Sequence, residues 1–314
     1  MTSTSTQEFH GVIPAIVTPT TNSGDVDVAQ LAELTRQLID AGVHGILACG
    51  STGEFSSLSV AQRKVVVATV CDTAAGQVPV MALTSALSMA DTIELSRHAE
   101  SCGVSAALAL TPFELPLSWR EVLSFYRSLS DAVSIPLAIY HIPLTTNVTF
   151  TLEQLGELGQ VRGVRYIKES SGDGELLAGL IEHQIAGGPR VLAAADPLMF
   201  AALASGAAGV ISGPANVAPR LFVELYDAMR TGELTRARAL WSLIYQYCRY
   251  LYANVSAYPS ALKAAMRLTG FDPGGPFPPR LPLDASEEPA LEAVVAPLRP
   301  WIKVTATVPA GDAV

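Results

Sequence analysis

Of the four lysines in the chain, only Lys168 lies at the end of a predicted strand, where its side chain could enter a reactive site. Lys168 ends a short apolar run, whereas the other lysines lie in helix-like segments or near the C-terminal end. A lysine at the end of a buried strand loses hydration, which disfavours the ammonium and lowers its pKa. The neutral amine is the form that attacks a carbonyl. Lys168 is therefore a candidate for imine chemistry, and an ordinary ion pair with Glu169 is the alternative.

A polar turn with two hydroxyl side chains is the second candidate site. It reads Gly50-Ser51-Thr52-Gly53-Glu54 and directly follows an apolar segment. Free backbone N–H groups in such a turn, together with hydroxyls, can hold a carboxylate or a phosphate. An ordinary glycine-rich turn has the same composition, and the motif alone leaves both interpretations open.

Two further segments end apolar runs in the same way. Tyr140 ends one of them, and from a strand adjacent to Lys168 its phenol could pass protons during imine formation. A core tyrosine with a satisfied hydroxyl is the alternative. The segment that begins at Ile211 and runs to Asn216 is either a phosphate loop or a wall of the pocket.

The histidines and cysteines form no metal-binding pattern. The five histidines include no i, i+4 pair and no cluster with carboxylates, and the four cysteines are widely spaced without a C-x-x-C pair. Zinc sites depend on such ligand spacing. No G-x-S-x-G nucleophile turn occurs either. We therefore expect no metal ion and no cofactor other than the lysine imine itself.

The elements that must position these residues alternate along the chain. A short apolar strand, a polar or glycine-containing turn and an amphipathic helix recur, which predicts a parallel sheet. Eight such strands suggest a closed barrel, whose active site lies at the carboxyl ends of the strands. A doubly wound open sheet is the rival fold, but no G-x-G-x-x-G turn opens a helix. The predicted strands cover residues 12–17, 45–48, 78–83, 106–110, 136–140, 164–168, 191–194 and 209–211.

The helical pattern continues beyond the eighth strand, over residues 221–252 and 261–268. We predict an α/β fold, a (β/α)8 TIM barrel with an appended C-terminal helical segment. A stretch rich in proline and glycine, residues 271–289, is expected to form an irregular strap before a final helix over residues 291–298. The predicted parts are a disordered leader (1–8), the barrel core (9–218), the last barrel helix with the helical segment (219–303) and a tail (304–314).

Composition excludes several classes of partner. Hydrophobic residues make up 49% of the chain and the net charge is −9, with no run of lysine and arginine to attract nucleic acid or anionic lipid. The longest apolar runs fall far short of a bilayer span, and the N-terminus has no signal-peptide pattern. We expect a cytoplasmic enzyme that acts on a small molecule, without a nucleic-acid or membrane partner.

In the identity and order of these residues, the chain resembles the dihydrodipicolinate synthase and N-acetylneuraminate lyase family of Schiff-base enzymes. The resemblance spans roughly residues 9–303, and its motifs are specific in order and spacing. They are Gly11-Val12 through Thr18-Pro19, Gly50-Ser51-Thr52-Gly53-Glu54, Thr111-Pro112, Tyr140 with Pro143, Ile167-Lys168-Glu169-Ser170-Ser171, and Gly209-Val210-Ile211-Ser212-Gly213 with Asn216.

The resemblance implies roles for four of these residues. Lys168 would form the imine with a 2-oxo acid, usually pyruvate, while Tyr140 moves protons at that carbon. Ser51 and Thr52 would hold the carboxylate, and Thr52 would also orient Tyr140. The resemblance further implies a homotetramer built as a dimer of dimers.

Departures from the family pattern narrow the expected function. Dihydrodipicolinate synthases resemble one another in a tyrosine pair after Thr-Pro and an arginine five residues beyond the catalytic tyrosine, whereas this chain has Phe113-Glu114 and Thr145. His141 stands where an asparagine often follows the tyrosine. We expect these four residues to contact the second substrate. We do not expect the protein to act in lysine biosynthesis.

Three classes of function therefore stay open at this stage. The first is aldol cleavage or condensation of a pyruvate-type 2-oxo acid. The second is dehydration of a 2-keto-3-deoxy sugar acid through the same lysine imine. The third is a barrel that binds an anionic ligand without catalysis.

Overall fold

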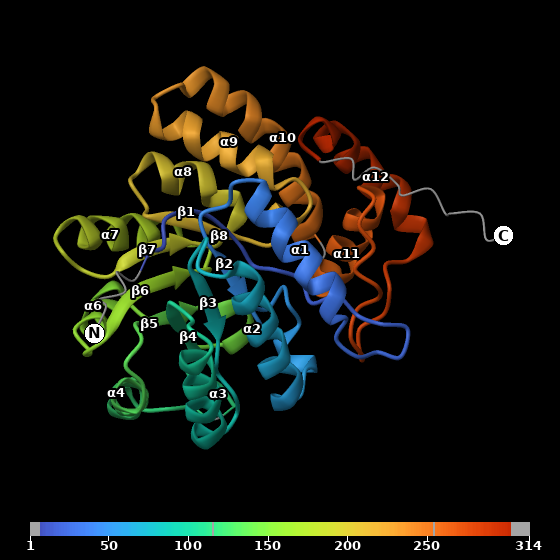
Figure 1. Cartoon of the computed structure of the whole chain (residues 1–314). Helices are drawn as coiled ribbons and strands as arrows, with labels where there is room; N and C mark the ends of the chain where they lie inside the picture. Colours follow the sequence, from blue (N-terminus) through green and yellow to red (C-terminus); the bar gives the residue numbers. More distant parts are fainter. Residues whose placement is uncertain (1–6, 115, 254, 303–314) are drawn as a thin grey trace.

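The barrel predicted from the alternating pattern is present in the computed structural model, which describes residues 7–114, 116–253 and 255–302. Most of the predicted leader and the whole predicted tail lie outside the described residues. Eight parallel strands form one sheet in which β1 pairs with β8 and the order then descends to β2 (Figure 1). A bridge between Ala15 and Leu47 brings β1 and β2 together and nearly closes the barrel. The strands are β1 (Gly11–Pro14), β2 (Ile46–Ala48), β3 (Val80–Leu83), β4 (Ala106–Leu110), β5 (Leu137–His141), β6 (Val164–Glu169), β7 (Arg190–Ala193) and β8 (Gly209–Ser212).

Helices follow the strands and cover the outside of the barrel (Figure 1). Several begin where the sequence places a capping side chain, as at Ser59, which forms a capping box with Gln62. Apolar residues three or four apart face the sheet, for example Val122, Tyr126 and Leu129 of the helix after β4. The helices of the barrel are α1 (Val28–Asp40), α2 (Val60–Ala74), α3 (Met89–Ser101), α4 (Trp119–Ala132), the short α5 (Pro143–Thr146), α6 (Leu152–Gly159), α7 (Gly174–Ile185), α8 (Met199–Ala204) and α9 (Pro219–Arg230).

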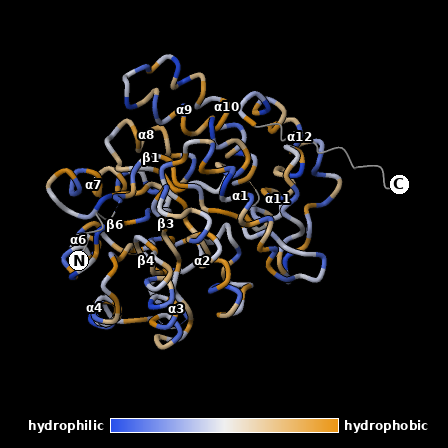
Figure 2. The backbone as a smooth tube through the Cα atoms, in the orientation of Figure 1, coloured by the Kyte–Doolittle hydropathy of each residue, from blue (hydrophilic) through white to orange (hydrophobic). Residues whose placement is uncertain are grey.

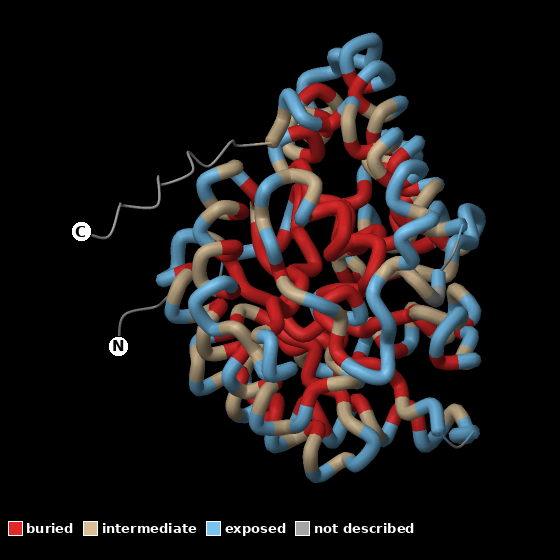
Figure 3. The backbone as a smooth tube through the Cα atoms, turned by 90° about the vertical axis from the view of Figure 1, so that its right-hand side faces the viewer, coloured by how far each residue is buried: buried red, intermediate tan, exposed pale blue. Residues whose placement is uncertain are grey.

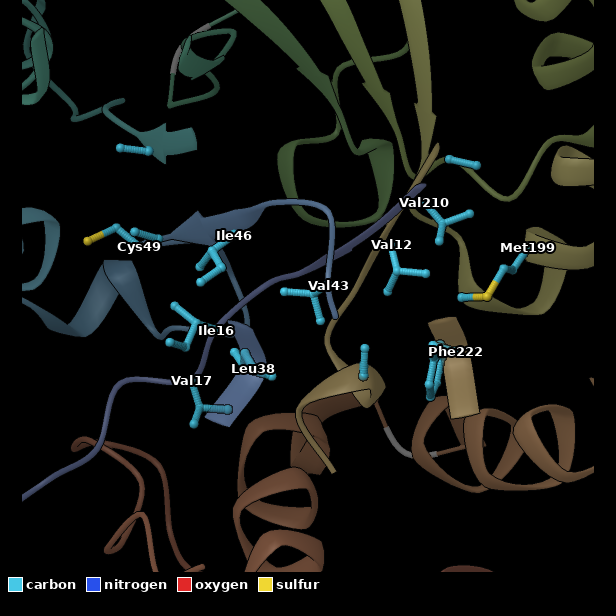
Figure 4. Packing of buried hydrophobic residues seen from close by; sticks show 14 of the residues in the cluster. Val12, Ile16, Val17, Leu38, Val43, Ile46, Cys49, Met199, Val210 and Phe222 are labelled. Carbon is cyan, nitrogen blue, oxygen red and sulfur yellow. The ribbon is translucent and has the colours of Figure 1, made fainter. Parts of the chain in front are cut away.

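Alternate residues of each strand pack in two separate apolar layers. Ile13, Leu108 and Leu192 belong to the cluster inside the barrel. Val12 and Val210 belong to the larger layer between strands and helices, where they lie near Phe222 of α9 (Figure 4). Figure 3 shows the buried segments gathered at the centre of the molecule, and Figure 2 shows hydrophobic and hydrophilic residues alternating along the outer helices. Because side chains alternate with a period of two, a strand residue's position decides which layer it enters.

The appended helical segment consists of α10 (Leu234–Ala253), α11 (Tyr258–Leu268) and α12 (Glu288–Val295). The predicted run 221–252 is divided between α9 and α10, because Gly232 adopts a left-handed conformation that ends the first helix. The predicted strap joins α11 to α12, and α11 lies beside α1 (Figure 1). Within the described residues, every helix is too short or too polar to cross a bilayer.

Candidate active site

Lys168 and Tyr140 meet at the carboxyl ends of neighbouring strands. They are partners in the register of β5 and β6, and strand parity turns both side chains toward the barrel interior. Lys168 Nζ lies 3.4 Å from the centroid of the Tyr140 ring. The Tyr140 hydroxyl lies 3.4 Å from Ser51 Oγ. Three residues from separate strand ends of the sequence, Ser51, Tyr140 and Lys168, are therefore adjacent in the fold.

The Lys168 amine is buried. Within the described residues, none of the ion pairs includes Lys168. Burial lowers the pKa of Lys168, while Tyr140, Asp196 and Glu169 act in the opposite direction. A lower pKa makes the neutral amine available at a pH where an exposed lysine is still protonated.

The backbone of the turn after β2 is held by the segment that follows β1. Thr18 Oγ1 donates to the Gly53 carbonyl at 2.8 Å, and a Cβ at position 53 would lie 3.0 Å from the Ile16 carbonyl. In the described part of the chain, the backbone N–H groups of Ser51 and Thr52 have no intramolecular acceptor. Donors held in this way suit a carboxylate.

A cavity of about 160 Å³ joins these groups. Loops after six of the strands form one part of its wall, and the C-terminal segment forms the rest. Among the predicted residues, Ser51, Thr52, Tyr140, Thr145, Lys168 and Ile211 line it. The other lining residues are Ala15, Ile142, Leu144, Ser170, Ala194, Asp196, Gly213, Tyr252, Val255, Tyr258, Pro259 and Arg280.

The model of the dihydrodipicolinate synthetase family matches residues 8–297 of the chain. The chain belongs to this family. It is 37% identical to an uncharacterized DapA-like lyase of Halobacterium salinarum, an alignment that covers 92% of this chain and 94% of the relative. It is 35% identical to the 4-hydroxy-tetrahydrodipicolinate synthase of Methanothrix thermoacetophila, over 88% of this chain and 91% of that protein.

A solved structure of the same family has the same fold and contains a 2-oxo acid. YagE, a prophage protein of Escherichia coli K12, was determined in complex with pyruvate; its TM-score with this chain is 0.88 at 28% identity, with coverage of 93% and 99% of the two chains. The family and these relatives support a lyase-type enzyme.

In this family member, His141 does not line the cavity as predicted. It follows Tyr140, so strand parity turns its side chain outward into the layer between strands and helices. There His141 Nδ1 lies 2.6 Å from Glu169 Oε2, and Nε2 accepts from the Phe150 backbone N–H at 3.2 Å. The same contact occupies Glu169, which is therefore not the ion-pair partner of Lys168.

Three other predicted residues also lie outside the cavity lining. Phe113 and Glu114 are exposed, and Phe113 lines a separate cavity with residues of the loop after β5. Gly50 is buried against Leu47, whose side chain would lie 3.2 Å from a Cβ at that position. Gly50 therefore shapes the turn, while Ser51 and Thr52 face the cavity.

Asp196 is a site residue that the sequence reasoning missed. It is buried, lines the cavity and accepts hydrogen bonds from Ser212 Oγ at 2.5 Å and Tyr252 Oη at 2.9 Å. Burial raises the pKa of Asp196 to about 6, against the effect of these donors and of Lys168. Its position in the sequence is the signal that could have identified it, because Asp196 follows shortly after β7 and the carboxyl ends of barrel strands carry the active site.

The loop after β8 is a wall of the cavity. Gly213 lines it, and a Cβ there would lie 2.3 Å from Tyr258 Oη and 2.8 Å from Thr52 Oγ1. The polar residue of this loop, Asn216, donates to the Ala15 and Gly213 carbonyls at 2.7 Å. Asn216 thus holds the loop against β1, and Gly213 leaves room for the side chains of Thr52 and Tyr258.

Proposed function

We propose that this protein is a Schiff-base lyase that acts on a pyruvate-type 2-oxo acid by reversible aldol cleavage and condensation. The observation that carries the proposal is the buried Lys168 amine beside Tyr140, in a cavity that also contains the Ser51 and Thr52 turn. Nucleophile, proton-transfer group and anion site are the three parts that this chemistry needs.

The covalent step begins with the neutral Lys168 amine, which attacks the C2 carbonyl carbon of the 2-oxo acid. The carbonyl oxygen gains a proton, the amine loses one, and the resulting carbinolamine releases water to give the imine. Tyr140, through its hydroxyl, is placed to carry these protons between nitrogen and oxygen. When the C3–C4 bond of a 4-hydroxy-2-oxo acid breaks, the protonated imine accepts its electron pair and becomes an enamine, while the 4-hydroxyl group loses its proton and that fragment leaves as an aldehyde. The enamine is then protonated at C3, and water hydrolyses the resulting imine to release pyruvate and the Lys168 amine.

The remaining lining residues complete the site. The free N–H groups of Ser51 and Thr52 would hold the 2-oxo acid's carboxylate next to the forming imine. Asp196 lies in the same cavity as Lys168, and its negative charge favours the protonated imine over the neutral one. Burial thus favours the neutral amine for attack, whereas Asp196 favours the charged imine for bond cleavage. The scheme uses no other cofactor.

The second substrate is not expected to bind as in a lysine-pathway synthase. Thr145 lines the cavity at the position where those enzymes resemble one another in having an arginine, and it supplies no charge. Dehydration of a 2-keto-3-deoxy sugar acid would use the same imine and is the alternative reaction. The two differ in whether a carbon–carbon or a carbon–oxygen bond breaks.

Borohydride trapping tests the imine directly. The full-length protein is incubated with pyruvate and sodium borohydride, and its intact mass is measured beside that of the Lys168→Ala variant. We expect a covalent adduct in the wild type and none in the variant. EDTA-treated protein should react equally well. A wild type that gains no mass with any 2-oxo acid would be a binding protein, and the proposal would be wrong.

Product analysis then separates the two reactions. With 2-keto-3-deoxy acids as substrates, aldol cleavage yields pyruvate and an aldehyde, whereas dehydration retains the carbon skeleton. We expect pyruvate among the products. A product that keeps every carbon atom would assign the dehydratase reaction.

A further inference from the structure

We propose that the amino ends of β5, β6 and β7 form a second ligand site, which binds a soluble organic phosphate. The site lies at the end of the barrel opposite to Lys168, and the inference does not depend on the imine chemistry. A cavity of about 580 Å³, here called the amino-end cavity, opens at this end of the three strands. It is lined mainly by residues 159–166 and 187–190, with Gln7 and Glu8 from the start of the described chain.

Positive charge dominates the wall of the amino-end cavity. Among its described lining residues, the three arginines Arg162, Arg165 and Arg190 stand against one carboxylate, that of Glu8, and the others are uncharged. The chain as a whole has a net charge of −9, so three guanidinium groups around one hollow are a local exception. Such groups attract an anion and can bind its oxygens with paired hydrogen bonds.

A bulge in β6 exposes Arg165. Val164 pairs with Leu137 of β5, but the next pair joins Tyr166 to Ala138, so Arg165 has no partner in this ladder. A bulge of this kind redirects the side chain of the extra residue. Val164 and Tyr166 are buried, whereas Arg165 is exposed. Within the described residues, the Arg165 side chain makes no hydrogen bond or ion pair, so its guanidinium can bind a ligand without losing a partner.

Arg190 reaches the amino-end cavity from the start of β7. Its Nη1 donates to Glu8 Oε2 at 2.6 Å, while its Nε is buried and has no hydrogen-bond partner among the described residues. Burial raises the pKa of the Tyr166 hydroxyl, and the charges of Arg190 and Arg165 lower it. Both guanidinium groups therefore lie near one hydroxyl. A buried donor without an acceptor is costly, and an anion that enters this cavity can supply the acceptor.

Arg162 completes the cluster from the turn between α6 and β6. Its Nη2 donates to the Ser130 carbonyl at 3.0 Å and to Asp131 Oδ1 at 2.8 Å. The side chains of Arg162 and Asp131 are 72% and 77% exposed, and ion pairs at such exposure contribute little to stability. A guanidinium has five N–H donors, so Arg162 keeps donors for a ligand beside these two contacts.

The charge and the size of the amino-end cavity together favour an organic phosphate. A phosphate monoester carries close to two negative charges at neutral pH and three strong acceptor oxygens, which suits several guanidinium groups better than one carboxylate does. The volume of about 580 Å³ lies within the range of about 300–1,000 Å³ that small-molecule sites have, and an inorganic ion leaves most of it unfilled. Pro136, Val161 and Pro189 supply apolar surface for the organic part of the ligand.

Matched pairs of probes test the proposal. Binding to the full-length protein is measured by titration calorimetry for AMP against adenosine and for glycerol 3-phosphate against glycerol, at constant ionic strength in the presence of EDTA. The two members of each pair differ by the phosphate. We expect at least one phosphate to bind saturably, one per chain, with a dissociation constant roughly tenfold or more below that of its neutral partner, as charged hydrogen bonds provide.

Substitutions assign the binding to the arginines of this cavity. Arg165→Gln should weaken phosphate binding by roughly tenfold or more, and Arg165→Lys should weaken it less, because it keeps the charge but loses the planar fork. Arg162→Gln is a second variant at an exposed position and should also weaken binding. Arg238→Gln is the matched control, because Arg238 of α10 is exposed and without a hydrogen bond or ion pair in the described structure, but does not line the cavity. It should bind the phosphate as the wild type does.

The outcomes separate this site from the imine site. The proposal is overturned if neither phosphate binds saturably, or if the neutral partner binds equally well. Binding that survives both Arg165→Gln and Arg162→Gln would place the anion elsewhere, for example at the Ser51 and Thr52 turn, and an equal loss in Arg238→Gln would reduce the effect to net charge. Either result overturns the site. Borohydride trapping with pyruvate should be the same in Arg165→Gln and the wild type, so each proposal can fail without the other.

Discussion

Lys168 and Lys263 are both buried, and burial lowers the pKa of each, yet their surroundings differ. Lys168 Nζ borders a cavity and lies over the ring of Tyr140. Lys263 Nζ is enclosed between a Glu54 oxygen at 2.8 Å and the Gly275 carbonyl at 2.7 Å. A lowered pKa alone therefore does not distinguish a nucleophile. The two lysines differ in what surrounds the amine: Lys168 Nζ borders a cavity, whereas Lys263 Nζ contacts a carboxylate and a carbonyl.

The largest expected effect is on the lysine that faces the cavity. Lys168→Ala should reduce turnover by about 10⁴-fold or more while the barrel stays folded, because the nucleophile is lost and only a side chain at the cavity floor is shortened. Lys168→Arg should be equally inactive, since a guanidinium stays protonated. Steady-state kinetics and circular dichroism check both variants. Turnover retained in a folded variant would contradict the assignment.

The enclosed lysine should affect stability instead. Lys263→Met leaves Glu54 as an unpaired buried charge, which should lower the free energy of unfolding by about 3–5 kcal/mol. Urea denaturation measures the loss. The double variant Glu54→Gln, Lys263→Met removes both charges and should recover much of the stability. A single variant as stable as the wild type would show that the pair does not hold the strap.

Tyr140→Phe tests the neighbour of the proposed nucleophile Lys168, because it removes the hydroxyl and keeps the ring. We expect turnover to fall by about 10²-fold, which is the lower end of what a positioned acid–base group contributes. Rapid-quench trapping with pyruvate should show slower imine formation at an unchanged final yield. An unchanged rate would assign proton transfer to another group.

The smallest effect is a shift in pH dependence from Asp196→Asn. The negative charge of Asp196 raises the pKa of Lys168, so its removal should lower that pKa and move the trapping profile to lower pH. Turnover should fall by about tenfold above pH 6, because the protonated imine loses its counter-charge. Burial raises the pKa of Asp196 to about 6, so at lower pH the Asp196 side chain of the wild type is also neutral. The pH profiles of the wild type and the variant should therefore coincide at low pH. Parallel profiles at every pH would contradict this role.

The sequence predicted the fold well because its signals are local. All eight predicted strands are present, since each is a short apolar run bounded by turn residues. Lys168, Tyr140 and Ser51 could be predicted for the same reason: the end of a strand is a local feature, and the barrel brings such ends together.

The errors have two physical causes. The prediction that His141 lines the cavity is wrong because His141 follows Tyr140, and adjacent strand residues point to opposite faces. Phe113 and Glu114 lie in an irregular loop, whose direction does not follow from periodicity. The walls supplied by Tyr258 and Arg280 depend on how the C-terminal segment docks. That docking depends on contacts such as Glu54 with Lys263, more than two hundred residues apart.

The long separation between Glu54 and Lys263 also sets an order of events during synthesis. The ribosome makes Glu54 and the whole barrel core before Lys263 emerges, and a carboxylate without its partner is stabilised by water. The turn that bears Ser51 and Thr52 therefore reaches its final, buried arrangement only after α11 and the strap have been made. A chain that ends before α11 contains Lys168 but lacks the part of the cavity wall that Tyr258 and Pro259 form.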